Sequence, residues 1–205
     1  MNGGETQTFY VAPFIKKTYA ANKKTNAIFD GELFLGIERP LRSNLQGEIG
    51  VAVAATSNAN LSGDIWDFGS ARFNNSSYTY QVQHTHIAAK GKLVADVGYA
   101  IKPYVSGSLG VGFNQAYDFA ITPTIFAAVA APNFNSTTTT AFTYTLGFGV
   151  QRAINAHWRA GIGYEFADWG KNQLGAAPGQ VLGSGILLNH FYTNGLQLSI
   201  CYYHA

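Results

Sequence analysis

The sequence predicts an all-β chain that folds as an eight-stranded antiparallel up-and-down transmembrane β-barrel, and three observations favour this fold class. Charged residues make up 12% of the 205 residues, yet no run approaches the roughly 18 apolar residues that a transmembrane helix requires. Several segments alternate apolar residues with small or polar ones, as strands with two different faces do. Short and long connections follow one another along the chain, which is typical of barrels in an outer membrane.

Composition excludes several other classes. A length of 205 residues fits one domain over residues 1–205. The formal charge is +2 and the 13 Lys and Arg residues are scattered, so no nucleic-acid partner is expected. Cys201 is a single cysteine, which excludes an intrachain disulfide and favours a small inward-facing side chain. The start of the chain, Met-Asn-Gly-Gly, does not resemble a secretory signal, so we expect a mature form.

The first half of the chain predicts four strands. Residues 8–16 form the first, with Phe9, Val11, Pro13 and Ile15 assigned to the lipid side, although the two faces are similar enough for either assignment. Residues 29–38 and 45–54 alternate clearly and form a hairpin. Residues 78–95 exceed the roughly 9 to 11 residues of a tilted membrane strand, so the upper part of this strand should stand above the bilayer.

The second half predicts four more strands, at 104–113, 142–151, 158–166 and 194–203. Short turns at about 40–44, 96–103 and 152–156 are assigned to the periplasmic rim, and four long loops to the outside: about 17–26, 56–77, 114–139 and 168–189. Aromatic residues at the strand ends are expected to form two interfacial girdles. The upper girdle takes Tyr78, Tyr80, Tyr144, Tyr164, Phe166 and Tyr192, and the lower takes Trp158 and Tyr202.

The last strand carries a family resemblance. Gly195, Leu198, Ile200 and Tyr202 resemble the assembly signal on the closing strand of bacterial outer-membrane barrels, although His204 and Ala205 follow where that family usually ends on its aromatic residue. Together with the Gly-rich inward faces, this segment makes the chain similar to the eight-stranded family that includes the OmpA transmembrane domain, OmpX-like proteins and opacity-type surface proteins. The resemblance implies location in a bacterial outer membrane, contact with its lipid and lipopolysaccharide, and assembly by the outer-membrane machinery.

Charged residues on the inward faces are the first candidate site. The predicted alternation turns three acids and three bases into the lumen: Glu32, Glu48, Lys90, Lys92, Arg159 and Glu165. Unpaired charges in so narrow an interior would cost several kcal/mol, so we expect them to pair. The set then acts either as a structural ion-pair plug or as a gated path for water and ions, as in a narrow porin-like channel.

Enzyme chemistry is not expected. His84-Thr85-His86 departs from the His-x-Ser arrangement of a lipid A deacylase, so the sequence predicts no catalytic residue. His84 and His86 share one face and could bind a metal between strands, but the same residues suit a polar strand segment above the membrane, so we assign neither metal nor cofactor. Asp168 and Trp169 are interpreted as a strand end and a girdle ring.

The long loop at 114–139 is the second candidate site because it holds an apolar set: Ile121, Ile125, Phe126, Val129 and Phe134. These side chains either fold back over the barrel mouth or onto Trp66 and Phe68, or they contact the outer leaflet, another protomer or a host surface. The leading functional hypothesis is an outer-membrane structural or surface-interaction protein with adhesion or host contact through its loops. A narrow porin-like channel is the alternative, a lipid-modifying enzyme a remote one, and a soluble lipocalin-like barrel the rival fold.

Overall fold

The computed structural model describes residues 5–12, 14–23, 25–126, 128, 131–180 and 183–204. These residues form an all-β antiparallel sheet, as predicted, and the single helical segment among them is the 3₁₀ turn η1 (Ala71–Phe73). Among the described residues, no helix is long and apolar enough to cross a membrane. The strands are β1 (Gln7–Ala12), β2 (Ile15–Ala21), β3 (Asp30–Arg42), β4 (Leu45–Thr56), β5 (Ala59–Asp67), β6 (Asn74–Ala95), β7 (Ile101–Pro123), β8 (Thr137–Ala153), β9 (Trp158–Asp168), β10 (Asn172–Gln173), β11 (Leu187–Leu188) and β12 (Tyr192–Tyr202).

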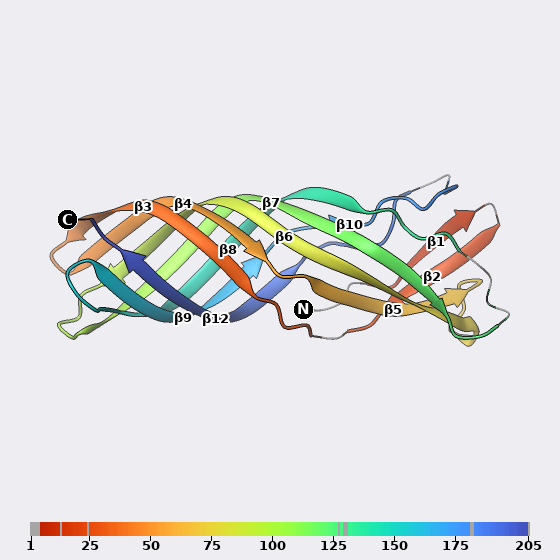
Figure 1. Ribbon diagram of the computed structural model, residues 1–205, viewed down its shortest axis with the longest axis horizontal. Helices are drawn as coiled ribbons and strands as arrows, with labels where there is room; N and C mark the ends of the chain where they lie inside the picture. The colour runs from red at the N-terminus through yellow and green to blue at the C-terminus, as the bar shows by residue number, and fades with distance from the viewer. Residues whose placement is uncertain are drawn as a thin grey trace.

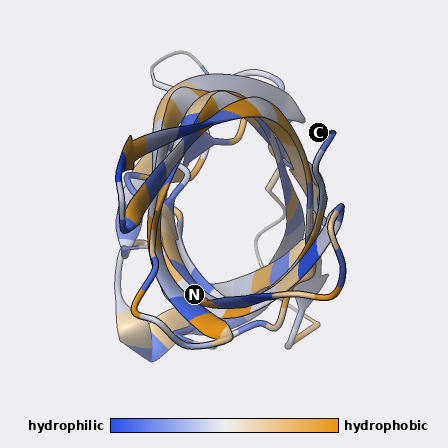
Figure 2. Cartoon of the chain, turned by 90° about the vertical axis from the view of Figure 1, so that its left-hand side faces the viewer, coloured by the Kyte–Doolittle hydropathy of each residue, from blue (hydrophilic) through white to orange (hydrophobic). Residues whose placement is uncertain are grey.

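The sheet curls around the long axis of an elongated molecule, as the side and end views show (Figures 1 and 2). The half of the molecule that ends in the chain turns at 43–44, 96–100 and 154–157 is called the lower half, and the other is called the upper half. These three turns overlap the three predicted short turns. In the lower half, antiparallel ladders join the described strands in the order β3-β4-β6-β7-β8-β9-β12. In the upper half, β5 replaces β4 beside β6, and β2 and β1 follow it.

The N-terminal segment is where the strand prediction was wrong. Residues 8–16 do not form one membrane-length strand: β1 and β2 make a hairpin in the upper half, where Phe14 adopts a left-handed φ of 66°. Val11 is 1% exposed and Tyr10 is 61% exposed, so the faces are also opposite to those assigned. Pro13 lies outside the described residues. Because both faces of this segment are apolar, alternation alone could not fix the phase.

The long loops contain more regular structure than the sequence indicated. β2 occupies part of the predicted loop 17–26, and β5 with the start of β6 occupies much of 56–77. β7 and β8 extend into 114–139, and the short pair β10–β11 lies within 168–189. The polar composition of these segments suggested loops, but in β5 and the start of β6 polar residues alternate with buried ones on regular strands.

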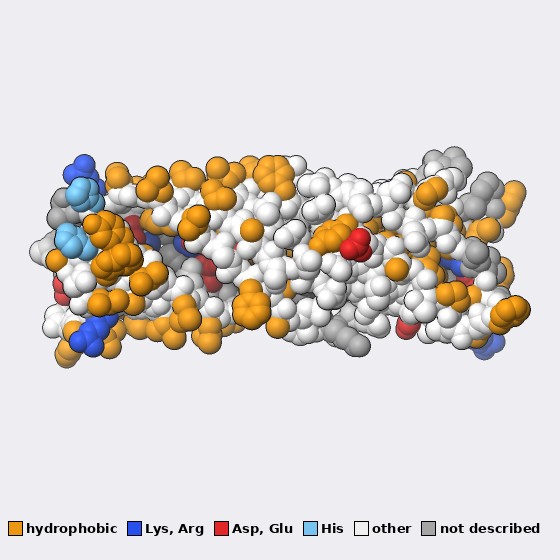
Figure 3. All heavy atoms as spheres, in the orientation of Figure 1, with side chains coloured by type: hydrophobic (Ala, Val, Ile, Leu, Met, Phe, Trp, Pro, Cys, Tyr) orange, Lys and Arg blue, Asp and Glu red, His pale blue; other side chains and the backbone are white. Residues whose placement is uncertain are grey.

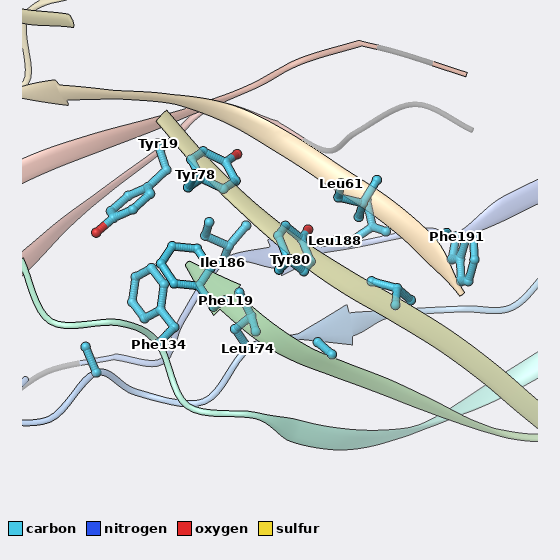
Figure 4. Packing of buried hydrophobic residues seen from close by; sticks show 14 of the residues in the cluster. Tyr19, Leu61, Tyr78, Tyr80, Phe119, Phe134, Leu174, Ile186, Leu188 and Phe191 are labelled. Carbon is cyan, nitrogen blue, oxygen red and sulfur yellow. The ribbon is translucent and has the colours of Figure 1, made fainter. Parts of the chain in front are cut away.

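A packed aromatic core fills the upper half (Figure 4). Tyr19 packs against three other rings of this core, with ring centroids 5.1 Å from Phe134, 5.6 Å from Tyr78 and 6.3 Å from Phe119. Asp118, at a φ of 53°, marks an irregularity of β7 after which Phe119 turns inward, following the buried Ala116. The core includes residues of the 168–191 segment, chiefly Trp169, Leu174, Ile186, Leu188 and Phe191.

Candidate functional site: a charged interior below an aromatic cap

Strict alternation separates the two faces of the lower half. On β4, Glu48, Ala52 and Ala54 are buried, whereas the intervening Ile49, Val51 and Val53 are exposed. Side chains of a strand point alternately to opposite faces, so the charges of these strands meet on the concave side of the curled sheet. The interior of the lower half is therefore polar, and its outer surface is apolar.

Lys90 of β6 is the centre of the charged interior. Its Nζ lies 2.5 Å from Oε1 of Glu32 on β3 and 3.5 Å from Oε2 of Glu165 on β9. The Lys90 side chain is 9% exposed, and those of Glu32 and Glu165 are 19% and 16% exposed. One ammonium thus joins carboxylates from two strands that share no ladder with β6.

Lys92 and Glu48 form a second ion pair, two residues further along β6 toward the lower end. The Lys92 Nζ lies 3.3 Å from Oε1 of Glu48 and 5.0 Å from the ring centroid of Tyr104. Tyr203, just after β12, donates its hydroxyl to the same carboxylate at 2.8 Å. The Glu48 carboxylate is therefore shared between an ammonium and a phenol.

Arg159 of β9 forms a bidentate pair with Glu38 of β3, a partner that the predicted set omitted. Its Nη2 donates to Oε1 of Glu38 at 3.0 Å and its Nη1 donates to Oε2. The guanidinium also stacks over the Tyr203 ring at 3.9 Å. Glu38 lies six residues after Glu32, at the same phase of the alternation, so its spacing could have identified it. With Glu38 included, all six predicted lumen charges have an oppositely charged partner.

A histidine and tryptophan layer closes the interior above these ion pairs. The buried rings of His84 and His86 lie 4.3 Å and 4.9 Å from the Trp169 ring. His84 Nδ1 lies 2.6 Å from Asn114 Oδ1, and the amide of Asn114 donates to the Trp169 carbonyl at 2.7 Å. Trp169 is thus a buried cap rather than the girdle ring that the sequence suggested, because the segment after β9 folds back against the inner face of the curled sheet.

Metal or hydrolytic chemistry would need His, Cys or acidic side chains to gather at one place. No group of three or more His, Cys, Asp or Glu side chains gathers as a metal site among the described residues. Asp168 is the last residue of β9, and its Oδ2 lies 2.9 Å from Nδ1 of His190. The His190 ring stacks on Tyr192. Neither side chain meets a serine or threonine hydroxyl in the described hydrogen bonds.

The apolar loop set is divided by the structure. Phe134 is buried in the aromatic core and Ile121 packs against that core from the end of β7. Ile125 and Phe126 are exposed at the upper end, and Val129 lies outside the described residues. Phe68 does not meet them in the core, because it is exposed and packs on Phe73 at 5.7 Å.

The assembly-signal residues all lie on β12. Leu198, Ile200 and Tyr202 point outward and are exposed, and Tyr202 packs edge-on against Trp158 at 5.1 Å. A Cβ added to Gly195 would meet nothing within 4 Å.

A scan against protein-family models found no match for the chain, and a search of curated proteins found none either.

Proposed function

We propose that the chain is a transmembrane β-barrel of a bacterial outer membrane that serves as a structural or surface-interaction protein. Its lower half lies in lipid, its upper half stands outside the cell, and its interior is plugged. Lipid and lipopolysaccharide surround the lower half, and the outer-membrane assembly machinery inserts it. The upper end contacts a host or surface ligand.

The inversion of polarity along β6 carries this proposal. Even-numbered residues of β6 face inward from Ser76 to Lys90, so the phase does not change. Above, these inward residues are Tyr78, Tyr80 and Val82, and the outward ones are Thr79, Gln81 and Gln83. Below, the inward residues include Lys90 and the outward ones Ile87 and Ala89.

Each half of β6 therefore matches a different solvent. Apolar side chains inside with polar ones outside suit water, and the reverse order suits lipid around a polar lumen. The space-filling view supports the same division, with hydrophobic side chains crowding the outer face of the lower half (Figure 3, left), whereas much of the rest is backbone and side chains that are neither hydrophobic nor charged. A soluble lipocalin-like barrel would require apolar side chains inside along the whole strand.

Strand length supports the same placement. β6 has 22 residues and β7 has 23, about twice the roughly 9 to 11 that a tilted membrane strand needs. The remainder extends the sheet beyond the bilayer on a packed core rather than on loose loops. Exposed rings gather on the connections at the upper end, namely Phe14, Phe68, Phe73 and Phe126. This stiff projection presents an apolar tip, which favours surface contact.

The filled interior favours a plug over the porin-like channel. Paired charges occupy the lower half, the Trp169 layer lies above them, and the aromatic core follows. Single-channel recordings of the refolded protein across salt concentrations test this choice. A folded, silent barrel is expected, whereas reproducible steps that scale with salt would establish the channel instead.

Lipid contact is tested with an environment-sensitive dye on single cysteines, in a Cys201→Ser background. In vesicles that contain brominated lipid, a dye at Leu109→Cys should be quenched, because this outward residue lies in the lower half. A dye at Thr79→Cys, outward on the upper half, is the matched control and should not be quenched. Equal behaviour at the two sites, or a folded protein soluble without detergent, would contradict the membrane assignment.

A further inference from the structure

The two end strands of the lower half, β3 and β12, have free edges among the described residues. β3 pairs with β4 and β12 pairs with β9, and no register pair joins β3 to β12. Both strands lie at the front of the molecule (Figure 1), where charged side chains are visible below the surface of the lower half (Figure 3). We call the space between residues 30–42 and 192–202 the edge slot.

Side-chain exposure indicates that the edge slot is open. Leu33 and Leu35 of β3 are 82% and 83% exposed, and Leu196 and Leu198 of β12 are 81% and 79% exposed. Outward leucines on strands paired at both edges are less exposed, with 62% for Leu109 and 61% for Leu146. A Cβ added to Gly195, which lies on the inward face of β12, would meet nothing within 4 Å.

Strand direction decides what can fill the slot. Six antiparallel ladders connect the seven strands from β3 to β12, so β3 and β12 run the same way, from the upper half to the lower. A strand running upward between them would pair antiparallel with both and give the even count of bacterial single-chain barrels. In a second copy inserted in the same orientation, the edge strands β3 and β12 also run from the upper half to the lower. Neither of them can therefore be the upward strand that pairs antiparallel with both edges of the slot.

Side chains inside the barrel hold the two rims of the slot in relation to each other. Glu38 of β3 forms its ion pair with Arg159 of β9, the neighbour of β12, and Lys90 contacts Glu32 and Glu165 on the same two sides. Near the slot the interior carries four glutamates, Glu32, Glu38, Glu48 and Glu165, against Lys90, Lys92 and Arg159. Because the bases are already paired, an incoming strand should not bring another acid.

We infer that the edge slot accepts one extended strand of a partner polypeptide by β-augmentation. The strand has about ten residues, since β12 offers 11, runs opposite to β3 and β12, and alternates apolar outward side chains with small uncharged inward ones. Main-chain hydrogen bonds to two edges supply the binding energy, and the alternation supplies the specificity.

The upward strand β7 provides a suitable probe, because it already lies antiparallel between β6 and β8. A synthetic peptide with the sequence of residues 104–113 has the required alternation without a charge. The refolded full chain is incubated with this peptide in detergent micelles, and amide hydrogen exchange is followed by mass spectrometry. A peptide of the same composition, reordered so that its apolar residues are contiguous, is the control.

The expected result is slower exchange on both edges. The amides of 30–42 and 192–202 that face the slot, about every second one, should exchange rapidly in the free chain and slow by about tenfold or more with the peptide, the factor that corresponds to one backbone hydrogen bond. Amides of β7 and β8 should stay protected throughout, which shows that the barrel is folded. The inference is overturned if the slot-facing amides are already protected without peptide, if one edge or neither edge responds, or if the reordered peptide protects equally.

Discussion

Replacing Lys90 with methionine removes the ammonium that lies between Glu32 and Glu165. At an effective dielectric constant of about 20, the contacts at 2.5 Å and 3.5 Å correspond to attractions of ~7 and ~5 kcal/mol. Most of this attraction offsets the desolvation of three ions, which costs several kcal/mol each. Lys90→Met leaves the carboxylates of Glu32 and Glu165 in the interior without this ammonium. Removing one partner of a buried ion pair typically lowers the free energy of unfolding by about 3–5 kcal/mol.

Burial is what makes this contact matter, and the chain contains a matched control. Lys102 contacts Asp96 at the same 2.5 Å, but their side chains are 30% and 41% exposed at a lower turn. Lys102→Met should therefore cost less than about 1 kcal/mol. A triple variant, Lys90→Met with Glu32→Gln and Glu165→Gln, should recover most of the stability, because no charge is left unpaired.

Urea unfolding in micelles, followed by tryptophan fluorescence, measures all three variants, and a heat-modifiability gel confirms that each folds. Equal losses for Lys90→Met and Lys102→Met would refute the argument that burial decides the cost. A triple variant no more stable than Lys90→Met would refute the argument that unpaired carboxylates cause it.

Three further predictions concern the upper half. Tyr19→Phe should raise the free energy of unfolding by about 1 kcal/mol in the same urea assay, because the buried Tyr19 hydroxyl has no hydrogen-bond partner among the described residues; a loss of stability would contradict this. Burial raises the pKa of Tyr19, Tyr78 and Tyr80 above the usual 10.0. Their contribution to the free energy of unfolding is therefore complete below pH 10 and is lost as the pH rises beyond it. Urea unfolding between pH 8 and 11.5 should show this decline, and Tyr80→Phe should make it shallower. Because Phe126 is exposed, Phe126→Ser should change the free energy of unfolding by no more than about 0.5 kcal/mol but weaken binding to cells. Because Phe134 is buried, Phe134→Ala should lower the free energy of unfolding by about 3–5 kcal/mol. Similar losses of stability for the two variants would show that the exposed ring is part of the core.

Alternation made much of the lower half predictable from sequence. A strand has a period of two, so assigning one residue of β4 or β9 to a face assigns the whole strand. Glu48 and Arg159 were placed inside in this way, and the structure gives both a partner. The partners themselves were harder to predict, because they depend on which strands lie opposite each other: Arg159 meets Glu38, 121 residues away.

The upper half was less predictable for two physical reasons. Segment 8–16 is apolar on both faces, so its alternation does not distinguish one long strand from the hairpin of β1 and β2. Trp169 and Phe134 lie on connections, and a connection that folds back into a core leaves no periodic signal in the sequence. Their burial depends on contacts with distant residues, as in the stacking of Trp169 on His86.

Period and chemistry carry separate information along β6, and both are needed to describe this molecule. The period places Tyr78 and Lys90 on the same inner face, yet one lies in an aromatic core and the other in an ion-pair cluster. The neighbouring outward residues change in the opposite sense, from Thr79 to Ile87. A strand in a single solvent has no reason to exchange the chemistry of its two faces at constant phase. The exchange on β6 is therefore the strongest argument that the two halves fold against different surroundings.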